Sequence, residues 1–492
     1  MFVKRITVGP SDRAEFNNIT DMCVGTGRVD LALHAEYQRQ LHAVQELCRF
    51  RYIRGHGLFS DQMGIYQHFT GPDGKKRVWY CFTYLDRVMD AWLDAGLRPF
   101  IETGFMPSAL TDSPNTLFYW QAHTAPPRDM KEWTDLVQAA LRHLAERYGR
   151  AEVESWPVEI WNEPNLPGFW ENADKAGYLE LYRATVLAIK EVLPGMRTGG
   201  PAICGGEGSQ QWIRDFLTFC RDNAVPVDFV TRHAYMGMTP ERRGRYLYHD
   251  MRAPEDLAEE MRISRQVIRS FPEYRDLPLY ITEFNTSYNP FCPIHDTNYN
   301  AALCAGVLSR VGDEADMCSY WTFGDVFEEQ GIPTHPFHGG FGLAANGLIP
   351  KPTLWTFAFF AGLKGEPVYR DGNAVIVRRA DGGYEAVLWN LGDEEQVEIS
   401  LPMKDAVALT ERVDGECCDP LRAWHLMGEP ENLTEEQLRF LRQAAQPRAE
   451  ALPAPAGKVL VTLAPNAVVR LKILPAPGRG DEGYDYAYYC KD

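Results

Sequence analysis

Two glutamates in this sequence directly follow apolar, strand-like runs. Glu163 lies in the motif Asn162-Glu163-Pro164, and Glu283 follows Leu279-Tyr280-Ile281-Thr282. Two carboxylates that face one pocket suit the hydrolysis of a glycosidic bond, because one donates a proton to the departing oxygen while the other attacks the sugar carbon or guides water to it. Either glutamate alone is explained as well by an ion pair or a helix cap. The two together, flanked by asparagine and many aromatic residues, favour the glycosidase interpretation.

Other reactive or aromatic side chains stand at the ends of further strand-like runs or just after them. An arginine there can keep a carboxylate ionised, a tyrosine can orient it, and an indole offers a floor to the apolar face of a sugar ring. Each such residue is, singly, more often part of the core than a ligand contact. Their recurrence at strand ends favours a binding pocket. The candidate contacts are Arg54, His56, Phe118, Asn162, His233, Tyr235 and Trp321.

The elements that must position these residues alternate along the first 325 residues. Eight strand-like runs are separated by helical patterns, of which the clearest are expected over 37–48, 133–148 and 178–193. Repeated strand–helix units predict a parallel sheet, and eight of them in about 300 residues is the number in a (β/α)8 TIM barrel. A doubly wound sheet is the main alternative. The runs start near Met22, Tyr52, Pro99, Val158, Thr198, Phe229, Leu279 and Cys318.

In such a barrel the working residues sit at the carboxyl ends of the strands. Glu163 and Glu283 are then expected to end the fourth and seventh strands, which face each other across the barrel mouth. The catalytic barrel is predicted over 14–350.

After Trp355 the pattern changes to antiparallel strands. Residues 374–379 and 384–389 read as a β-hairpin around a glycine turn, with further strands at 397–401 and 459–474 and a short helix at 434–445. We therefore expect an accessory β-sandwich-type domain over 355–475, joined by an N-terminal strand within 1–10. A tyrosine-rich C-terminal tail spans 476–492.

Composition narrows the partners of this chain. The 492 residues include 50 Lys and Arg against 67 Asp and Glu, a formal net charge of −17, which disfavours nucleic acid as the main partner. No run of 18 apolar residues occurs, so no membrane span is expected. The 11 cysteines show neither a CxxC motif nor regular spacing, which favours reduced thiols in the cytoplasm over a disulfide framework.

Cofactor and metal motifs are incomplete. Gly25-Thr26-Gly27 and Gly205-Gly206-Glu207-Gly208 complete neither a dinucleotide fingerprint nor a P-loop, so a nucleotide or phosphate binder is disfavoured. The histidines of His335-Pro336-Phe337-His338 are separated by a proline, and we interpret this segment as a loop bordering the active site. No cofactor and no metal is expected.

Four segments together resemble glycoside hydrolase family 39, and its bacterial β-xylosidases most of all. The likeness covers nearly the whole chain. The Asn-Glu-Pro motif is shared by a wide clan of barrel glycosidases. The segments Arg54-Gly55-His56-Gly57 and 327–331 (Phe-Glu-Glu-Gln-Gly) narrow the resemblance to the family. The segments are 52–57, 160–166, 282–285 and 320–323.

This resemblance implies roles for individual residues. Glu163 matches the general acid/base and Glu283 the nucleophile of a retaining, metal-independent mechanism. Trp321 matches a platform under the sugar, and a loop with Glu328 and Glu329 reaches sugar hydroxyls, with either glutamate as the contact. Matches to residues around the sugar are Asn162, His233 and Tyr235.

The implied activity is exo-acting removal of β-D-xylose from the non-reducing end of xylo-oligosaccharides, by a homo-oligomer that in this family is often a tetramer. One alternative keeps the chemistry and changes the sugar to an α-L-iduronide, β-glucoside, β-galactoside or arabinoside. Iduronate carries a carboxylate that needs a cationic contact, and the charge of −17 disfavours an anionic substrate. Another alternative is a non-catalytic carbohydrate-binding barrel.

Overall fold

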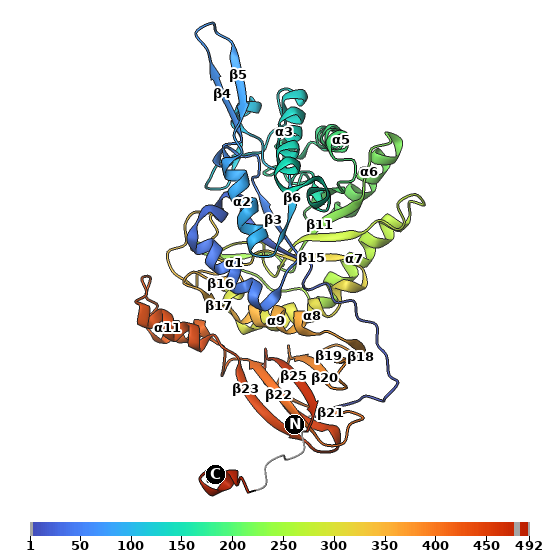
Figure 1. Cartoon of the computed structure of the whole chain (residues 1–492), viewed down its shortest axis with the longest axis vertical. Coiled ribbons are helices and arrows are strands. Elements are labelled where there is room, and N and C mark those ends of the chain that lie inside the picture. The colour runs from blue at the N-terminus through green and yellow to red at the C-terminus, as the bar shows by residue number, and fades with distance from the viewer. Residues whose placement is uncertain (1–2, 477–482, 491–492) are drawn as a thin grey trace.

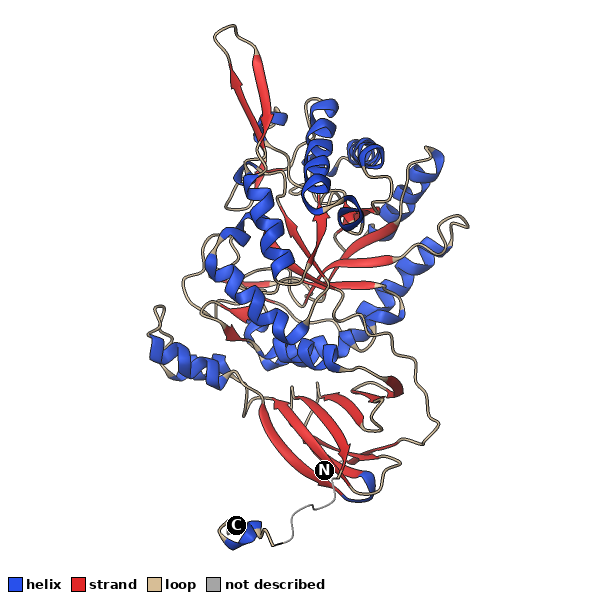
Figure 2. Ribbon diagram, in the orientation of Figure 1, coloured by secondary structure: helices blue, strands red, loops and turns tan. Residues whose placement is uncertain are grey.

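The computed structural model describes residues 3–476 and 483–490. Eight parallel strands close into a barrel in the upper part of the molecule (Figures 1 and 2). All eight predicted runs form its strands, and closure rules out the doubly wound alternative. The strands are β2 (Cys23–Arg28), β3 (Tyr52–His56), β6 (Arg98–Glu102), β9 (Val158–Glu159), β10 (Thr198–Ile203), β11 (Phe229–Tyr235), β14 (Leu279–Asn285) and β15 (Met317–Tyr320).

Helices cover the outside of the barrel. In α3, the Asp129 side chain caps the first turn, the stripe from Trp133 to Leu144 is buried, and Gly149 ends the helix. The three helices expected from periodicity are α1, α3 and α5. The helices of this layer are α1 (Ala35–Cys48), α2 (Thr83–Asp94), α3 (Met130–Tyr148), α4 (Arg150–Glu154), α5 (Lys175–Val192), α6 (Ser209–Asp222), α7 (Pro254–Arg269), α8 (Asn298–Leu308) and α9 (Pro352–Gly362).

The two ends of the barrel differ in chemistry. An apolar cluster that includes Phe100, Phe229 and Tyr280 fills the end at which the strands begin. At the other end, buried charged residues such as Arg54 and Glu283 point into the mouth. This polarity places the reactive groups where the loops can surround a ligand.

Several loops at the mouth of the barrel contain small β-hairpins. The hairpin β4–β5 projects far beyond the barrel at the top of Figure 1, after β3. The others lie closer to the body. Their strands are β4 (Tyr66–Thr70) with β5 (Lys76–Tyr80), β7 (Thr116–Leu117) with β8 (Ala122–His123), β12 (Glu241–Arg243) with β13 (Tyr246–Tyr248), and β16 (Ala344–Ala345) with β17 (Ile349–Pro350).

Two further sheets form a sandwich below the barrel (Figure 1). The six-stranded sheet has the order β18-β19-β20-β25-β22-β23, and the three-stranded sheet has the order β1-β21-β24, with β1 parallel to β21. Apolar side chains of both sheets share one core. The strands are β1 (Val3–Thr7), β18 (Glu366–Arg370), β19 (Ala374–Arg378), β20 (Tyr384–Trp389), β21 (Glu395–Ser400), β22 (Ala406–Val413), β23 (Arg448–Ala454), β24 (Lys458–Leu463) and β25 (Val468–Pro475).

Between β22 and β23 an arm of two helices leaves the sandwich and lies beside the barrel. It consists of α10 (Pro420–Leu426) and α11 (Glu435–Ala444), with Thr434 capping α11 as the sequence predicts. Trp424 and Leu441 of this arm pack with Phe337 of a barrel loop. The barrel and the sandwich therefore contact each other through this arm, and also where α8 packs against β20 and β25.

Two remaining expectations concern the ends and the membrane. Part of the tyrosine-rich tail lies outside the described residues, and the four tyrosines that the structure describes there (Tyr484, Tyr486, Tyr488 and Tyr489) are all exposed. Among the described residues, none of the helices has both the length and the apolar character needed to cross a bilayer.

Candidate active site

Glu283 lies on β14 at the centre of the barrel mouth. The Nη1 of Arg54 donates to its Oε1 at 2.8 Å, and the hydroxyl of Tyr235 donates to its Oε2 at 2.6 Å. His56 Nε2 lies 3.4 Å from Oε1. A guanidinium and a phenol that both donate to one carboxyl group stabilise its ionised form. Donors on both oxygens therefore fix the orientation of the Glu283 carboxyl group.

Glu163 follows β9 on the opposite side of the mouth. It contacts His233 Nδ1 at 2.8 Å and receives no hydrogen bond from an arginine or lysine among the described residues. Burial and the negative charge of Glu283 raise the pKa of Glu163 well above its ordinary value. The surroundings thus favour the protonated form of Glu163, while Glu283 accepts hydrogen bonds from a guanidinium and a phenol, and a glycosidase requires such unlike surroundings for its two carboxyl groups.

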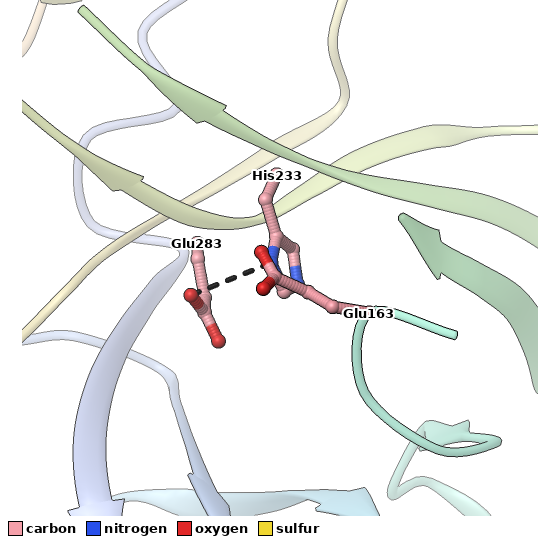
Figure 3. A group of neighbouring side chains, drawn as sticks. All are labelled: Glu163, His233 and Glu283. Carbon is pink, nitrogen blue, oxygen red and sulfur yellow. Dashed lines mark hydrogen bonds and ion pairs between the residues drawn. The ribbon is translucent and has the colours of Figure 1, made fainter. Parts of the chain in front are cut away.

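The two carboxyl groups are close together. One carboxyl oxygen of Glu163 lies within 4.8 Å of one of Glu283, with His233 between them (Figure 3). Retaining glycosidases hold their carboxyl groups about 5–5.5 Å apart, whereas inverting enzymes keep them about 6.5–9.5 Å apart to admit water. The spacing fits direct attack on the sugar by one carboxylate.

The backbone around Glu163 is strained. Trp161 and Glu163 have φ angles of 71° and 42°, in the left-handed region that favours glycine. The amide of Glu163 donates to Ala202 O at 2.9 Å, and the indole of Trp161 donates to Phe169 O at 2.8 Å. These contacts hold an unfavourable conformation that brings the carboxyl group into the mouth.

Arg54 organises a layer of acids below the site. It is fully buried and lies 2.6 Å from Glu159, 3.1 Å from Glu102 and 2.8 Å from Asn162 Oδ1. Burial disfavours its charge, but the three carboxylates around it outweigh this and raise the pKa of Arg54. Glu102 and Glu159 are missing from the sequence-based prediction, although each ends a strand-like run just as Glu283 does.

His233 is a neutral bridge between the two catalytic candidates. Burial and the charge of Arg54 lower the pKa of His233 well below its ordinary value. Its Nδ1 lies 2.8 Å from Glu163 and 3.4 Å from Glu283. His56 lies on β3, next to β6, which carries Glu102. Its Nδ1 lies 2.5 Å from Glu102, and its Nε2 faces Glu283.

The mouth encloses a cavity of about 540 Å³. Six of the predicted residues line it, and Arg54, Asn162 and His233 lie buried directly behind them. The lining also includes residues that no strand-end signal marks, because loops and helix α7 contribute them. The predicted residues in the lining are His56, Glu163, Tyr235, Glu283, Trp321 and Glu329, and the others are Leu166, Phe169, Cys204, Gly205, Gly206, Gly237, Arg252, Glu260 and Tyr288.

The structure distinguishes Glu328 from Glu329. Glu328 forms an ion pair with Arg28 and does not line the cavity. Glu329 faces the cavity, with its side chain 12% exposed, and the amide of Tyr119 holds its carbonyl at 2.7 Å. Burial, together with the charges of Glu283 and Glu163, raises the pKa of Glu329 well above its ordinary value.

Two other predicted positions lie outside the lining. Phe118 stacks against the far side of His56 at 6.2 Å and supports that ring. The loop of His335 and His338 does not reach the cavity, since the His335 ring stacks on Trp424 of the helical arm at 5.1 Å. Our interpretation of this loop as bordering the active site is therefore wrong.

Among the described residues, only one group of three neighbouring side chains could bind a metal ion. It consists of Glu163, His233 and Glu283. These are the residues already set up for acid–base chemistry. The guanidinium of Arg54 forms an ion pair with Glu283 at 2.8 Å and would repel a second cation there. The raised pKa of Glu163 further opposes metal binding, because ligands must be ionised.

Comparison with known families gives one match over most of the chain. The family described as Glycosyl hydrolases family 39 matches residues 5–459. Among curated proteins, a β-xylosidase of Geobacillus stearothermophilus is 46% identical over 456 residues, which cover 90% of each chain. A β-xylosidase of Caldicellulosiruptor saccharolyticus is 32% identical and covers 91% of this chain and 93% of its own length.

Solved structures agree with these matches. The crystal structure of a monomeric β-xylosidase from Caulobacter crescentus CB15 superposes with a TM-score of 0.88 at 33% sequence identity. The superposition covers 96% of this chain and all of the other. The likeness thus extends across the barrel and the sandwich together.

Proposed function

The chain belongs to glycosyl hydrolase family 39, a family of retaining glycosidases, and from this premise we propose that it removes β-D-xylose from the non-reducing end of xylo-oligosaccharides. The observation that carries the proposal is the carboxyl pair within 4.8 Å, in which burial and the charge of Glu283 raise the pKa of Glu163, and Arg54 and Tyr235 donate hydrogen bonds to Glu283. The names of the similar β-xylosidases support the choice of sugar.

In the first step, Glu283 attacks the anomeric carbon, and Glu163 gives its proton to the departing oxygen. A covalent ester forms between Glu283 and xylose, while the leaving group departs as an alcohol. Because the ester is neutral, the charge that helped to raise the pKa of Glu163 disappears, which keeps Glu163 ionised. Glu163 then takes a proton from water, and the resulting hydroxide releases xylose with its configuration retained.

Other lining residues are assigned to the sugar that becomes the ester. Trp321 offers an apolar ring face next to His56, 4.6 Å away. The Nδ2 of Asn162 is buried without a hydrogen-bond partner among the described residues, so it has a free donor for a sugar hydroxyl. Glu329 is placed to contact another hydroxyl. We propose that Asn162, His56 and Glu329 bind the hydroxyls and that His233 and Tyr235 position the two acids.

An acidic sugar such as iduronate suits the part of the cavity around Glu283 and Glu329 poorly. The described residues that line it include Glu283 and Glu329, and the only guanidinium below them, Arg54, is already surrounded by three carboxylates. A further carboxylate would lack a cationic partner there. This argument favours xylose over the iduronide alternative.

The direct test is release of nitrophenol from aryl β-D-xyloside by the purified protein, with Glu283→Gln beside it. Turnover by the native protein alone is expected. If neither protein turns over the xyloside, the same assay with arabinosides, glucosides, galactosides and iduronides tests the remaining sugars. Inactivity on all of them would favour the non-catalytic carbohydrate-binding barrel.

We further propose that the protein is a homo-oligomer, with four chains as the family resemblance implies. The projecting hairpin β4–β5 supports this, since Phe69, Val78 and Trp79 are 48%, 39% and 47% exposed on it. Exposed apolar side chains on one projection favour association. Sedimentation analysis of the native chain and of Phe69→Ser/Trp79→Ser is expected to give a smaller species for the variant, and a native monomer would contradict the proposal.

A cytoplasmic location is proposed from the cysteines. All 11 are free thiols, and several, such as Cys23 and Cys304, are buried where no second thiol is bonded to them. Free thiols in this number fit a reducing compartment. Fractionation of the cells that produce the protein tests the location.

A further inference from the structure

The cavity has two chemically different halves, with Glu163 between them. One half is acidic and is built around His56, Glu283, Trp321 and Glu329. The other half is built by the loops that follow β9, β10, β11 and β14 and by α7, and it is lined by Leu166, Phe169, Gly205, Gly206, Gly237, Arg252, Glu260 and Tyr288. Because Glu163 protonates the departing oxygen, this second half faces the leaving group.

Arg252 brings an arginine charge to the leaving-group half. It lines the cavity with its side chain 31% exposed, and its Nη1 donates to Glu260 at 2.8 Å. Glu260 also pairs with the fully buried Arg232. One carboxylate therefore serves two guanidiniums, which leaves a local charge of +1. The Nε of Arg252 donates to none of the described residues and is free for a ligand.

The loop that carries Arg252 is basic along its length. Residues 236–253 contain four arginines against Glu241 and Asp250, a formal charge of +2 in a chain of −17. Within the hairpin β12–β13 of this loop, Arg242 is exposed and forms no ion pair with a described residue. The same loop supplies Gly237 and Arg252 to the cavity wall. Arg252 is thus the arginine that this loop brings to the cavity wall.

We propose that the half of the cavity around Arg252 accepts a leaving group that carries a carboxylate, such as a xylose substituted with a uronic acid. This inference rests on the proposed xylosidase activity and names the leaving-group class for the same site. A guanidinium binds a carboxylate by charge-assisted hydrogen bonds. The acidic half, by contrast, retains the uncharged xylose.

Two aryl β-xylosides of equal size test this preference. One has 4-hydroxybenzoate as its leaving group, and the other has the neutral 4-hydroxybenzamide. The measured quantity is the ratio of kcat/KM for the acidic xyloside to kcat/KM for the neutral one. Arg252→Met is expected to lower this ratio about tenfold to a hundredfold, as the loss of one charge-assisted contact implies.

The ratio cancels those effects of Arg252→Met that are common to both xylosides. Arg252 also donates to Tyr235 O at 2.6 Å, so its replacement disturbs a residue that holds Glu283 and lowers both rates. A disturbance of Glu283 affects both xylosides alike, and the intrinsic difference between the leaving groups is the same in every variant. The matched control is Arg262→Met, since Arg262 is paired with Glu259 on the outer side of α7 and should leave the ratio unchanged.

A second measurement uses the native protein alone and does not depend on the folding of a variant. Raising the ionic strength is expected to lower the ratio of acidic to neutral turnover, because salt screens the partly exposed Arg252. A ratio that neither salt nor Arg252→Met changes overturns the inference while leaving the xylosidase activity intact. Failure of the native protein to hydrolyse either xyloside would instead count against the proposed function.

Discussion

At the scale of single residues, Glu163 and Glu283 show how two identical side chains acquire opposite roles. Glu283 has the donors Arg54 and Tyr235 on its two oxygens, while Glu163 has a neutral histidine and the charge of Glu283 nearby. The difference lies in the neighbours and not in sequence context. Each role can therefore be tested by removing one carboxyl group at a time.

Glu163→Ala should slow hydrolysis of xylobiose far more than that of nitrophenyl xyloside. General acid catalysis contributes about 10²–10⁴-fold, and a good leaving group such as nitrophenolate needs it least. Azide is expected to restore turnover of nitrophenyl xyloside by attacking the ester in place of water. Equal losses on both substrates and no effect of azide would assign the acid/base elsewhere. Steady-state rates with and without azide decide this.

The raised pKa of Glu163 has a consequence for stability with a definite sign. In the folded protein its proton is held more tightly than in the unfolded chain, so the native state loses stability as pH rises from the ordinary glutamate pKa toward the raised one. Glu163→Gln lacks this cost. The quantity to compare is the free energy of unfolding of the variant minus that of the native protein. This difference should increase with pH over the interval and stay constant above it.

Denaturant titrations of both proteins at a series of pH values measure this difference. The rate profile should respond to the same group, with activity falling as pH rises through the raised pKa because the proton donor is lost. A pH-independent stability difference would show that Glu163 is not protonated by its surroundings.

At the scale of elements, the loop that carries Glu329 is fixed by a buried ion cluster. Lys351, which precedes α9, lies 2.7 Å from Asp296 and 2.6 Å from Asp325, and all three side chains are at most 2% exposed. Its ammonium also donates to Gly340 O at 2.7 Å. Asp325 lies on the loop between Trp321 and Glu329. One cation thus ties three segments together under the acidic half of the cavity.

Lys351→Met should be strongly destabilising, by about 3–5 kcal/mol, because it leaves two buried carboxylates without a partner. The loss should shrink in acid, where protonation neutralises the aspartates. In molecules that remain folded, KM should rise more than kcat falls, since the loop with Glu329 loosens. Lys351→Arg keeps the charge and should retain much of the stability. Urea unfolding at two pH values and xyloside kinetics provide the measurements.

Close contacts between elements also explain the two glycines of the Gly25-Thr26-Gly27 motif. Gly25 lies within β2, where a Cβ atom would come within 2.5 Å of the Trp321 ring. At Gly27 a Cβ atom would meet the ring of Phe327 at 2.8 Å. The glycines therefore make room for the aromatic residues under the acidic half of the cavity.

At the scale of the whole molecule, barrel and sandwich share a core. Trp389 of β20 is buried and packs near Phe360 of α9, with ring centroids 6.1 Å apart. Residues of both parts belong to one cluster of buried apolar side chains. We propose that 14–350 and 355–475, with the strand within 1–10, are distinct in architecture but unfold as one unit.

Trp389→Ala tests that proposal. The loss of a buried indole should cost about 3–5 kcal/mol and lower the stability of both parts together. Calorimetry is expected to show a single transition that moves to lower temperature. The control Leu460→Ala alters a residue that is 51% exposed on β24 and should have little effect. Two separate transitions, only one of which moves, would show independent domains.

The sequence by itself determined the eight barrel strands, three of the covering helices and the two glutamates that follow the fourth and seventh strand-like runs. These follow from local patterns, because hydrophobic periodicity and strand ends are properties of neighbouring residues. It also indicated the sandwich hairpin and the N-terminal strand. The family motifs added the roles of Glu163 and Glu283.

Only the tertiary structure decided which of the two adjacent glutamates, Glu328 and Glu329, faces the cavity, and that Glu102 and Glu159 surround Arg54. It also placed Arg252 in the leaving-group half and moved the His335 loop away from the site. The physical reason is that barrel closure brings together residues more than 100 positions apart. The path of each loop then sets the burial and charge around a side chain, and sequence spacing does not record that path.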